Sequence, residues 1–499
     1  MTSNSLLPLA AVLIPVVTGS VVFFLDEGRR GLRTVLNLSG AALSLLVVMV
    51  MLVGVFQEQA YAFRWPLLAG LELYLEADAF AMLFSPLSSG LWLVTTVYAV
   101  GYMEHYRNRR RFFGFFSLCV ATTMGVALAG NLLTFFIFYE LLTLSTYPLV
   151  VHRGDARSLA VGTLYLRYTV GAGAVLLVGL IWIHGLTGTV EFTEGGFLAP
   201  FHEHDTSLRI IFFLLVGGFG VKAALVPLHG WLPMAMVAPA PVSALLHAVA
   251  VVKAGAFGIV RVVYDVFGVT FAHGLGVTGV LAVWAAVTIL YGSLRALAQD
   301  DLKRRLAYST VSQVSYIALG VAIAGPVATL GGVVHLVHQG VTKITLFFCA
   351  GNLAETLHIH KISEMDGVGR RLPLTMSAFT LGALGMIGIP PMAGFITKWY
   401  LGLGSLEAGQ PWVILVLLAS TLLNAAYFLP VLHRVWFRPP PHTLPTPARE
   451  APLFLLLPPL ITGLLALLTG LFAAAPFTPL EWSVLITERE YPHGYLPGP

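Results

Sequence analysis

Six ionisable side chains stand inside long apolar runs of this sequence, where a charge is hardest to accommodate. They are Glu140, Arg167, Lys222, Lys253, Lys343 and Lys398. A charge at the centre of a lipid bilayer costs about 3 kcal/mol or more, so such residues normally face a protein interior or water. Four of the chain's six lysines belong to this group, against a single acid well inside an apolar run. Because burial disfavours the ammonium form of lysine, this surplus of lysines indicates proton exchange.

Four histidines lie in or beside the same segments: His229, His247, His335 and His338. His335 and Lys343 are eight residues apart, which places them on nearly the same stripe of a helix about 12 Å apart. Bridging that gap requires water or polar groups such as Gln339. His247 and Lys253 are six residues apart, which puts them on different faces of one helix. We therefore expect His335 to act with the lysines, and the other three histidines to be auxiliary.

Two structural explanations compete with this interpretation. A lysine near a helix end can extend its stem to the lipid headgroups, which is an alternative for Lys398. A buried Glu–Lys ion pair explains one lysine but not four. The sequence has no tight group of His, Asp and Glu with the spacing of metal ligands, and its two cysteines, Cys119 and Cys349, are too few and too far apart for an iron–sulfur cluster. We expect no metal and no cofactor.

The composition defines the elements that must hold these residues. The 499 residues are 57% hydrophobic and only 10% charged, with a mean hydropathy of +0.84. Soluble domains carry about 25% charged residues, so a water-soluble enzyme and a nucleic-acid-binding protein are excluded. Since a membrane-spanning helix needs about 20 apolar residues, we predict an all-α integral membrane protein with about fourteen spans. These are 6–25, 34–55, 80–103, 113–130, 131–151, 161–185, 208–227, 241–264, 275–297, 305–323, 327–352, 373–403, 412–433 and 452–475.

The basic residues between the spans indicate an orientation. Alternate loops divide them nineteen to four, and the side with four also carries the acids Glu72, Glu76, Asp78, Glu191 and Glu194. Loops rich in Arg and Lys remain on the cytoplasmic side. The sequence therefore predicts a multi-pass protein of the prokaryotic cell (inner) membrane with both termini on the outer, periplasmic side. We call the side with nineteen basic residues the arginine-rich face.

Two segments combine a lysine with proline and glycine: GGFGVKAALVPLHGWLP (217–233) and GMIGIPPMAGFITKWYLG (385–402). Breaks in membrane helices are tolerated mainly where they line a cavity, and a pair of them in corresponding positions indicates an inverted repeat. We expect broken seventh and twelfth spans in two inverted five-helix repeats, 113–264 and 275–433. A three-helix segment, 1–112, precedes the repeats, and a final helix with a short tail, 434–499, follows them.

Four motifs resemble one known family. NLLTFFIFYELLTLSTYPLV (131–150), WLPMAMVAPAPVSALLHAVAVVKAG (231–255), HLVHQGVTKITLFFCAGNL (335–353) and GIPPMAGFITKWYLG (388–402) occur in order over most of the chain. They resemble the antiporter-like subunits of Mrp-type multisubunit sodium/proton antiporters, respiratory complex I and membrane-bound hydrogenases. The D-type Mrp subunit is the most similar in its ITLFFCAG and ISEMDGVGRR segments.

The resemblance implies a fourteen-helix fold with a hydrophilic axis in the membrane plane. It implies that Glu140 pairs with Lys222, and that Lys253, His335, Lys343 and Lys398 continue the path. Some relatives place a glutamate at the last of these positions. The family usually has a second histidine four residues after the first, where this chain has Gln339, with His338 one place earlier. At 499 residues we expect neither the lateral helix of the largest complex I subunit nor the extension of the large Mrp subunit.

From these features we predict a proton-translocating subunit of a multisubunit monovalent cation/proton antiporter. Its partners would be other membrane subunits, the lipid bilayer and protons, with sodium an open question, and the chain itself would perform no redox or hydrolytic chemistry. Three alternatives remain. They are a proton-pumping subunit of a complex I-like (NADH-quinone oxidoreductase) or hydrogenase-type redox complex, a membrane partner of a soluble protein that couples proton flow to bicarbonate uptake, and a scaffold that transports nothing.

Overall fold

The computed structural model describes residues 3–68, 70–440 and 450–491, and they are mostly helical. The first part of the chain forms two helices, a small sheet and five further helices. Their bounds are β1 (Ser3–Asn4), α1 (Leu7–Phe24), α2 (Arg30–Phe56), β2 (Tyr61–Leu68), β3 (Leu71–Glu76), α3 (Ala79–Tyr102), η1 (Met103–His105), α4 (Arg109–Ala127), α5 (Leu132–Val150), α6 (Ala156–Thr187), η2 (Ala199–His204) and α7 (Asp205–Lys222).

The second part is helical throughout and includes one π-helical turn, η4. The elements are α8 (Trp231–Met234), η3 (Ala235–Val237), α9 (Ala240–Ala248), α10 (Val251–Arg261), η4 (Val262–Phe267), α11 (Val269–Gly274), α12 (Val277–Leu297), α13 (Leu302–Ala322), α14 (Pro326–Leu357), η5 (Ile362–Glu364), η6 (Val368–Arg370), α15 (Pro373–Ile387), α16 (Ala393–Glu407), α17 (Trp412–Phe437), α18 (Leu453–Leu471) and α19 (Pro479–Glu490).

Eleven helical segments in the described part of the chain are long and apolar enough to cross a membrane. The three other expected spans, 113–130, 305–323 and 373–403, correspond to α4, to α13 and to the pair α15 and α16. They fall outside the eleven because they are more polar or are broken. The protein is therefore a multi-span helical membrane protein, and the count of fourteen stays a prediction.

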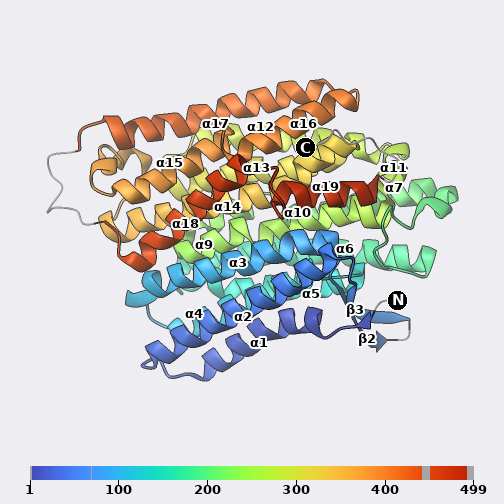
Figure 1. The fold of residues 1–499 in the computed structure, drawn as a ribbon, viewed down its shortest axis with the longest axis horizontal. Helices are drawn as coiled ribbons and strands as arrows, with labels where there is room; N and C mark the ends of the chain where they lie inside the picture. Colours follow the sequence, from blue (N-terminus) through green and yellow to red (C-terminus); the bar gives the residue numbers. More distant parts are fainter. Residues whose placement is uncertain (1–2, 69, 441–449, 492–499) are drawn as a thin grey trace.

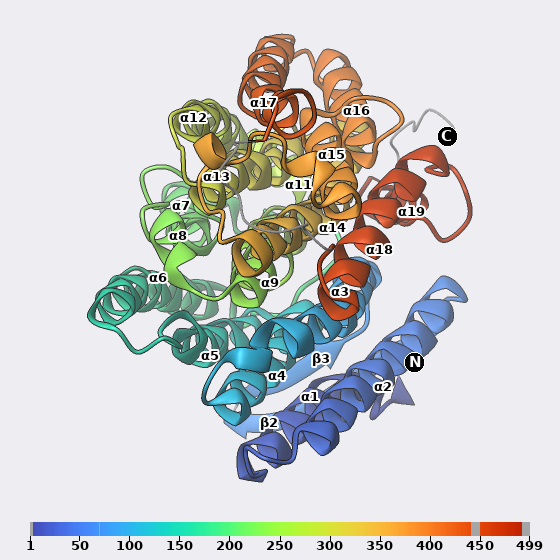
Figure 2. The same ribbon diagram turned by 90° about the vertical axis from the view of Figure 1, so that its left-hand side faces the viewer.

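The long helices run roughly side by side, with α14 at the centre of the bundle (Figures 1 and 2). Helix α14 packs against α3, α9, α13, α15, α16, α18 and α19. Its most apolar window is wholly buried, as is that of the segment Ala240–Phe267, whereas the corresponding windows of α1, α17 and α18 are only one-third buried. Apolar side chains that face outward on these peripheral helices suit contact with lipid rather than water.

Local chemistry explains several helix starts. The side chains of Asp78, Asn131, Asp155 and Asp301 accept hydrogen bonds from backbone N–H groups in the first turns of α3, α5, α6 and α13, respectively. Such caps satisfy N–H groups that have no partner within the helix. They fix where each span begins at the polar surface.

Both expected helix interruptions are present. Helix α7 ends at Lys222, and helical structure resumes only at Trp231. Helix α15 ends at Ile387, and α16 begins at Ala393. Each broken segment therefore places its lysine close to irregular backbone. The relation of the two breaks by an inverted repeat, and the domain boundaries built on it, stay predictions.

One further span is interrupted at a place that no proline marks. The segment 241–264 was expected as one helix, but α9 ends at Ala248 and α10 begins at Val251. Between them Ala250 has φ −94° and ψ −94°, outside the helical range. The angular argument that separated His247 from Lys253 was therefore wrong, because the two residues belong to different helices.

Two further elements lie outside the expected spans. Strands β2 and β3 form an antiparallel hairpin in the connection between α2 and α3, and β1 pairs with β2 in parallel. After the last expected span, α19 packs against α14 and α3. Its Trp482 donates a hydrogen bond from Nε1 to the carbonyl oxygen of Ala79, 2.8 Å away. Helix α19 therefore forms part of the bundle.

Candidate functional site

Lys222, at the end of α7, is completely buried against α5. Its Nζ lies 3.3 Å from the centroid of the Tyr139 ring and donates a hydrogen bond to the carbonyl oxygen of the same tyrosine. The Tyr139 hydroxyl in turn donates to the carbonyl oxygen of Gly218, 3.1 Å away, which ties the ring to α7. A ring face and a carbonyl oxygen both stabilise an ammonium ion.

Glu140 follows Tyr139 in α5 and is the acid whose charge acts on Lys222. The two side chains form no ion pair shorter than 4 Å among the described residues, and Glu140 Oε1 has no hydrogen-bond donor there. The carboxylate instead packs against Gly173 of α6, where an added Cβ would lie 2.6 Å from its Cδ. The expected Glu140–Lys222 pair is thus an interaction at longer range than a contact ion pair.

Lys253, near the start of α10, is completely buried, and its Nζ has no hydrogen-bond partner in the described structure. Helix α10 lies directly on α7 nearby, because a Cβ at Gly255 would collide with the backbone nitrogen of Ala223. His247, at the end of α9, is equally buried and packs against Phe347 of α14, with ring centroids 4.6 Å apart. The charge of Lys343 acts on both His247 and Lys253.

Lys343, in the middle of α14, is buried and donates a hydrogen bond to the Ser309 hydroxyl of α13 at 2.8 Å. The hydroxyl of Tyr427 donates to the same Ser309 oxygen at 3.1 Å and is also 2.6 Å from Oδ1 of Asn424. A polar cluster therefore joins α14, α13 and α17 at this lysine. Among these four residues there is no carboxylate.

His335 lies eight residues before Lys343 on the same helix and faces other neighbours. Its Nδ1 is 3.1 Å from the Thr397 hydroxyl of α16, and Nδ1 of His338 is 3.4 Å from the same hydroxyl. The ring of Tyr316 lies 5.3 Å from the His335 ring. The charges of Lys253 and Lys398 both act on His335, so this histidine stands between the two lysines electrostatically.

Lys398 lies in α16 beside the second helix break. Its Nζ donates to the carbonyl oxygen of Ile387 at 2.6 Å and to the Thr421 hydroxyl at 2.9 Å. The side chain also lines an open groove of about 410 Å³ between α16 and α17. Lys398 is therefore partly accessible, unlike the buried Lys222, Lys253 and Lys343.

Several buried polar atoms of these helices have no partner in the described protein. Besides Nζ of Lys253 and both ring nitrogens of His247, they are Gln313 Nε2, Tyr316 Oη, His335 Nε2, His338 Nε2 and both amide atoms of Gln339. Buried polar groups without a protein partner normally bind water, which makes about three hydrogen bonds at such a site. Their concentration on α9, α10, α13 and α14 indicates a hydrated region at the centre of the bundle.

Two of the candidate residues lie apart from this region. His229 sits in the connection between α7 and α8 and packs against Tyr291 and Tyr308, with ring centroids 5.0 and 6.2 Å away. Arg167 is exposed on α6 and lines an open groove between α6 and α7. Arg167 therefore faces the outside of the bundle rather than its centre.

Sequence reasoning missed a buried ion-pair cluster at the opposite side from the arginine-rich loops. Arg261 is 1% exposed and bonds Asp78 at 2.6 Å and Asp265 at 2.9 Å. Asp265 and Glu490 are buried, at 3% and 6% exposed, whereas Glu140 is only half-buried, so the most deeply buried acids of the described residues lie in this part of the bundle. Neither carboxylate contacts the lysines, because Asp265 is paired with Arg261 and Glu490 accepts a hydrogen bond from the Gly195 N–H. The i, i+4 spacing of Arg261 and Asp265 was the available signal.

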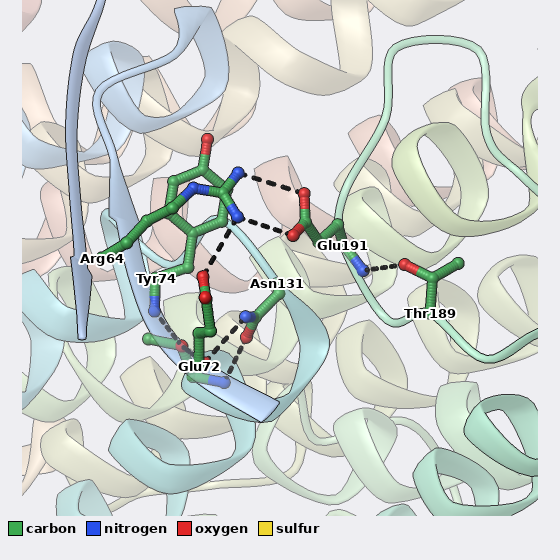
Figure 3. A network of polar contacts seen from close by, with 7 residues as sticks. Arg64, Glu72, Tyr74, Asn131, Thr189 and Glu191 are labelled. Carbon is green, nitrogen blue, oxygen red and sulfur yellow. Dashed lines mark hydrogen bonds and ion pairs between the residues drawn. The ribbon is translucent and has the colours of Figure 1, made fainter. Parts of the chain in front are cut away.

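A second polar network lies at the surface on the same side (Figure 3). Arg64 of β2 points toward Glu191 and Glu72, with Nη1 2.7 Å and 3.3 Å from their carboxylate oxygens. The Asn131 side chain donates to the carbonyl oxygen of Glu72 at 3.0 Å. The network connects the hairpin to the start of α5 and to the loop after α6.

The described residues contain no group of three or more His, Cys, Asp or Glu side chains that could hold a metal ion. Cys119 and Cys349 are free and buried, on α4 and α14. Carboxylates and the central lysines lie in separate parts of the bundle, with Glu140 as the exception. The arrangement suits the movement of protons between amines, imidazoles and water, since each of these groups can accept and donate a proton.

The fold and the buried amines define a polytopic membrane subunit of the antiporter-like class. Residues 129–424 match the family described as NADH:quinone oxidoreductase/Mrp antiporter, transmembrane. The chain belongs to this family, whose members include subunits of Mrp antiporters and of NADH-quinone oxidoreductases.

Both NADH-quinone oxidoreductase subunits and Mrp-type antiporter subunits resemble most of the chain. It is 35% identical over 428 residues to NADH-quinone oxidoreductase subunit N of Desulforudis audaxviator (strain MP104C), which covers 83% of this chain and 84% of that protein. It is 26% identical over 488 residues to the D-type subunit of the Na(+)/H(+) antiporter of Bacillus subtilis (strain 168), covering 96% and 97%. A chain of the Mrp complex from Dietzia sp. DQ12-45-1b superposes with a TM-score of 0.88 at 25% identity, covering 98% of both chains.

Proposed function

We propose that this chain translocates protons as a subunit of a multisubunit monovalent cation/proton antiporter. The observation that supports this most is the row of buried amines and imidazoles on α7, α10, α14 and α16. Lys222, Lys253 and Lys343 are completely buried, and His335 is nearly so. A structural role would require acidic partners for these groups, and the row contains only Glu140.

In this proposal Glu140 controls the proton on Lys222. Two unit charges about 5 to 6 Å apart interact by about 3 kcal/mol at an effective dielectric constant near 20, which corresponds to about a 100-fold change in proton affinity. When the carboxylate is ionised, Lys222 keeps its proton, and its ammonium group contacts the Tyr139 ring and carbonyl oxygen. When the carboxylate moves or is neutralised, the proton passes to Lys253.

The remaining steps follow the electrostatic neighbours. Lys253 interacts with Lys343 and with His335, and His335 interacts with Lys398. Like charges within this row repel one another, so a proton that arrives at one lysine favours release from the next. Lys398 is the exit, because its side chain reaches an open groove. His247 and His338 are auxiliary groups beside the row, and His229 lies at the first helix break.

Glu140→Gln and Lys222→Ala variants of the intact complex test this proposal in sealed vesicles. We expect proton flux to fall by about 10-fold or more in each, with unchanged assembly on a native gel. Normal flux in either variant would refute the scheme and favour the scaffold alternative, in which the buried lysines are individually dispensable.

The second candidate function is proton pumping within a complex I-like or hydrogenase-type redox complex. The 35% identity to an NADH-quinone oxidoreductase subunit favours it, whereas the near-complete alignment with a D-type antiporter subunit favours the first. Purification of the complex from its native membrane separates them. An antiporter yields only membrane subunits and cation-dependent proton exchange, while a redox complex also yields subunits with flavin or iron–sulfur absorbance. A copurifying zinc-containing soluble subunit would favour the bicarbonate-linked alternative instead.

We propose the cell membrane of a prokaryote as its location, with the arginine-rich face in the cytoplasm and both termini outside. The distribution of basic loop residues supports this orientation. A cysteine introduced at Arg110, which is exposed at the start of α4, should react with a membrane-impermeant maleimide only after the cells are opened. Labelling of intact cells would reverse the orientation.

A further inference from the structure

A cavity of about 240 Å³ opens at the arginine-rich face, away from the central lysines. The start of α6, the connection between α8 and α9 and the start of α13 surround it. Its basic lining residues are Arg153, Arg157, Lys303, Arg304 and His360. A water molecule occupies about 30 Å³, so the cavity has room for a polyatomic anion and several water molecules.

The charge of the cavity is positive and only partly compensated. Asp155 and Asp301 also line it, but each caps a helix: Asp155 Oδ1 accepts from the Ser158 N–H at 2.6 Å, and Asp301 Oδ1 from the Arg304 N–H at 2.8 Å. Within the part of the chain that the structure describes, no carboxylate lies within 4 Å of the charged groups of Arg153, Arg157, Lys303 or Arg304. Three guanidinium groups and the Lys303 amine therefore face the cavity against two engaged carboxylates.

Backbone dipoles add to this charge. Helix α6 has 32 residues and α13 has 21, and the N-termini of both open at the cavity. A helix N-terminus carries about half a positive charge and favours anions. These two ends, each capped by an aspartate, and four basic side chains surround one cavity, and their combined charge favours an anion there.

Lys303 anchors one wall of the site. Its Nζ donates to the carbonyl oxygens of Met236 at 3.0 Å and Ala238 at 2.6 Å, in the connection between α8 and α9. An ammonium group has three N–H donors, so one donor remains after these two bonds. The wall is therefore held in place before any ligand arrives.

We propose that this cavity binds the phosphate group of an anionic phospholipid in the leaflet on the arginine-rich side. Arginine matches phosphate oxygens through its planar fork of donors, and basic pockets between membrane helices on the cytoplasmic side bind anionic headgroups. The apolar part of the lining, Met234, Met236 and Val237, includes a methionine that is 40% exposed and suits contact with a lipid chain. The site is separate from the proposed proton path and does not depend on it.

Native mass spectrometry of the purified intact complex tests the site, with phosphatidylglycerol and phosphatidylcholine as probes. Arg153→Gln/Arg157→Gln is the test variant, and we expect it to fold because both side chains are exposed. Arg29→Gln/Arg30→Gln, which removes two exposed arginines of the same face, is the matched control. Each basic side chain near an anionic lipid contributes about a 5-fold factor in affinity. For the test variant only, two such factors predict about 30-fold weaker phosphatidylglycerol binding, with no change for phosphatidylcholine.

A competition with inorganic phosphate distinguishes the source of the group. Retention of phosphatidylglycerol in a large excess of phosphate supports the lipid assignment, whereas displacement with the same sensitivity to the variant assigns the site to soluble phosphate and overturns the lipid source. Equal binding by the test and control variants would overturn the site itself. A crosslink between a cysteine placed at Met234 and an acidic segment of a neighbouring subunit would also overturn the site, because that segment would then occupy the cavity.

Discussion

The Lys222 ammonium group lies over the Tyr139 ring, 3.3 Å from its centroid, and donates a hydrogen bond to the carbonyl oxygen of that same residue. The lysine is thus held by groups that cannot change protonation near neutral pH. Glu140, the next residue of α5, forms no contact ion pair with it. In the proposed mechanism, the carboxylate would therefore control the proton on the lysine through its distance from the amine, without holding the lysine in place.

The position of Glu140 can be altered without touching either charged residue. Gly173→Ala places a Cβ 2.6 Å from the Glu140 Cδ, and the flexible end of the glutamate must move away. A displacement of about 1 Å can cost up to about 100-fold in rate, so we expect proton flux to fall about 10- to 100-fold with normal assembly. Flux measurements in vesicles check this.

Gly171→Ala is the matched control for that substitution. Gly171 lies two residues earlier on α6, and an added Cβ there meets nothing within 4 Å. We expect normal flux from this variant. Equal loss in both variants would mean that α6 itself, rather than the place of the carboxylate, limits transport.

The two ion-pair networks opposite the arginine-rich face should differ strongly in their contribution to stability. Arg261→Ala leaves the buried Asp265 and the partly exposed Asp78 without their cation, and an uncompensated buried carboxylate costs about 3–5 kcal/mol. Arg64 is 41% exposed in its side chain, and loss of such a surface pair costs about 0–1 kcal/mol. Thermal unfolding of the two variants in the same detergent measures the difference. Indistinguishable melting temperatures would contradict the assignment of Arg261 as a buried structural anchor.

His152, in the loop after α5, gives the protein a pH-dependent stability. Burial, with Arg111 nearby, lowers the pKa of His152 to about 4 from its usual 6.5. Since the unfolded chain then binds more protons between these values, the free energy of unfolding is highest above the usual pKa and decreases as the pH falls toward the lowered one. The contribution is at most about 3 kcal/mol.

His152→Gln removes this pH-dependent contribution to the free energy of unfolding. We expect the melting temperature of the variant to decrease less than that of the wild type between about pH 7 and pH 5. Unfolding scans at matched ionic strength measure the difference. His433→Gln, at a histidine outside this loop, serves as the control and should follow the wild type. Parallel curves for His152→Gln and the wild type would show that the His152 ring does not titrate as the structure indicates.

Much of the fold follows from the sequence because a bilayer imposes strict rules. Apolar runs of about 20 residues locate the spans, and the breaks beside Lys222 and Lys398 coincide with Pro227 and with Pro390 and Pro391. The break at Val249 and Ala250 has no such marker. There α14 packs closely on the end of α9, since a Cβ at Gly340 would lie 2.9 Å from the Ala248 carbonyl oxygen. Contacts between distant segments set that geometry.

The candidate site, like the fold, could be predicted from the sequence only in part. The buried lysines stand out because charge inside an apolar run is rare, so Lys222, Lys253 and Lys343 could be selected from the sequence. Their neighbours could not. The Ser309 hydroxyl at Lys343, the Thr397 hydroxyl between the two histidines and the Asp78 carboxylate at Arg261 come from other helices or their caps. Such polar residues have no distinguishing pattern of their own along the chain.

Lys253 offers the most direct test of proton transfer through buried amines. Its Nζ has no hydrogen-bond partner among the described residues, so Lys253→Met removes the charge and keeps the volume without breaking any bond to the protein. Lys361→Met, at an exposed lysine of the arginine-rich face, is the control. Proton flux through vesicles containing the intact complex should fall to about one-tenth of the wild-type value or less for Lys253→Met and remain normal for the control. Wild-type flux from Lys253→Met would contradict the account.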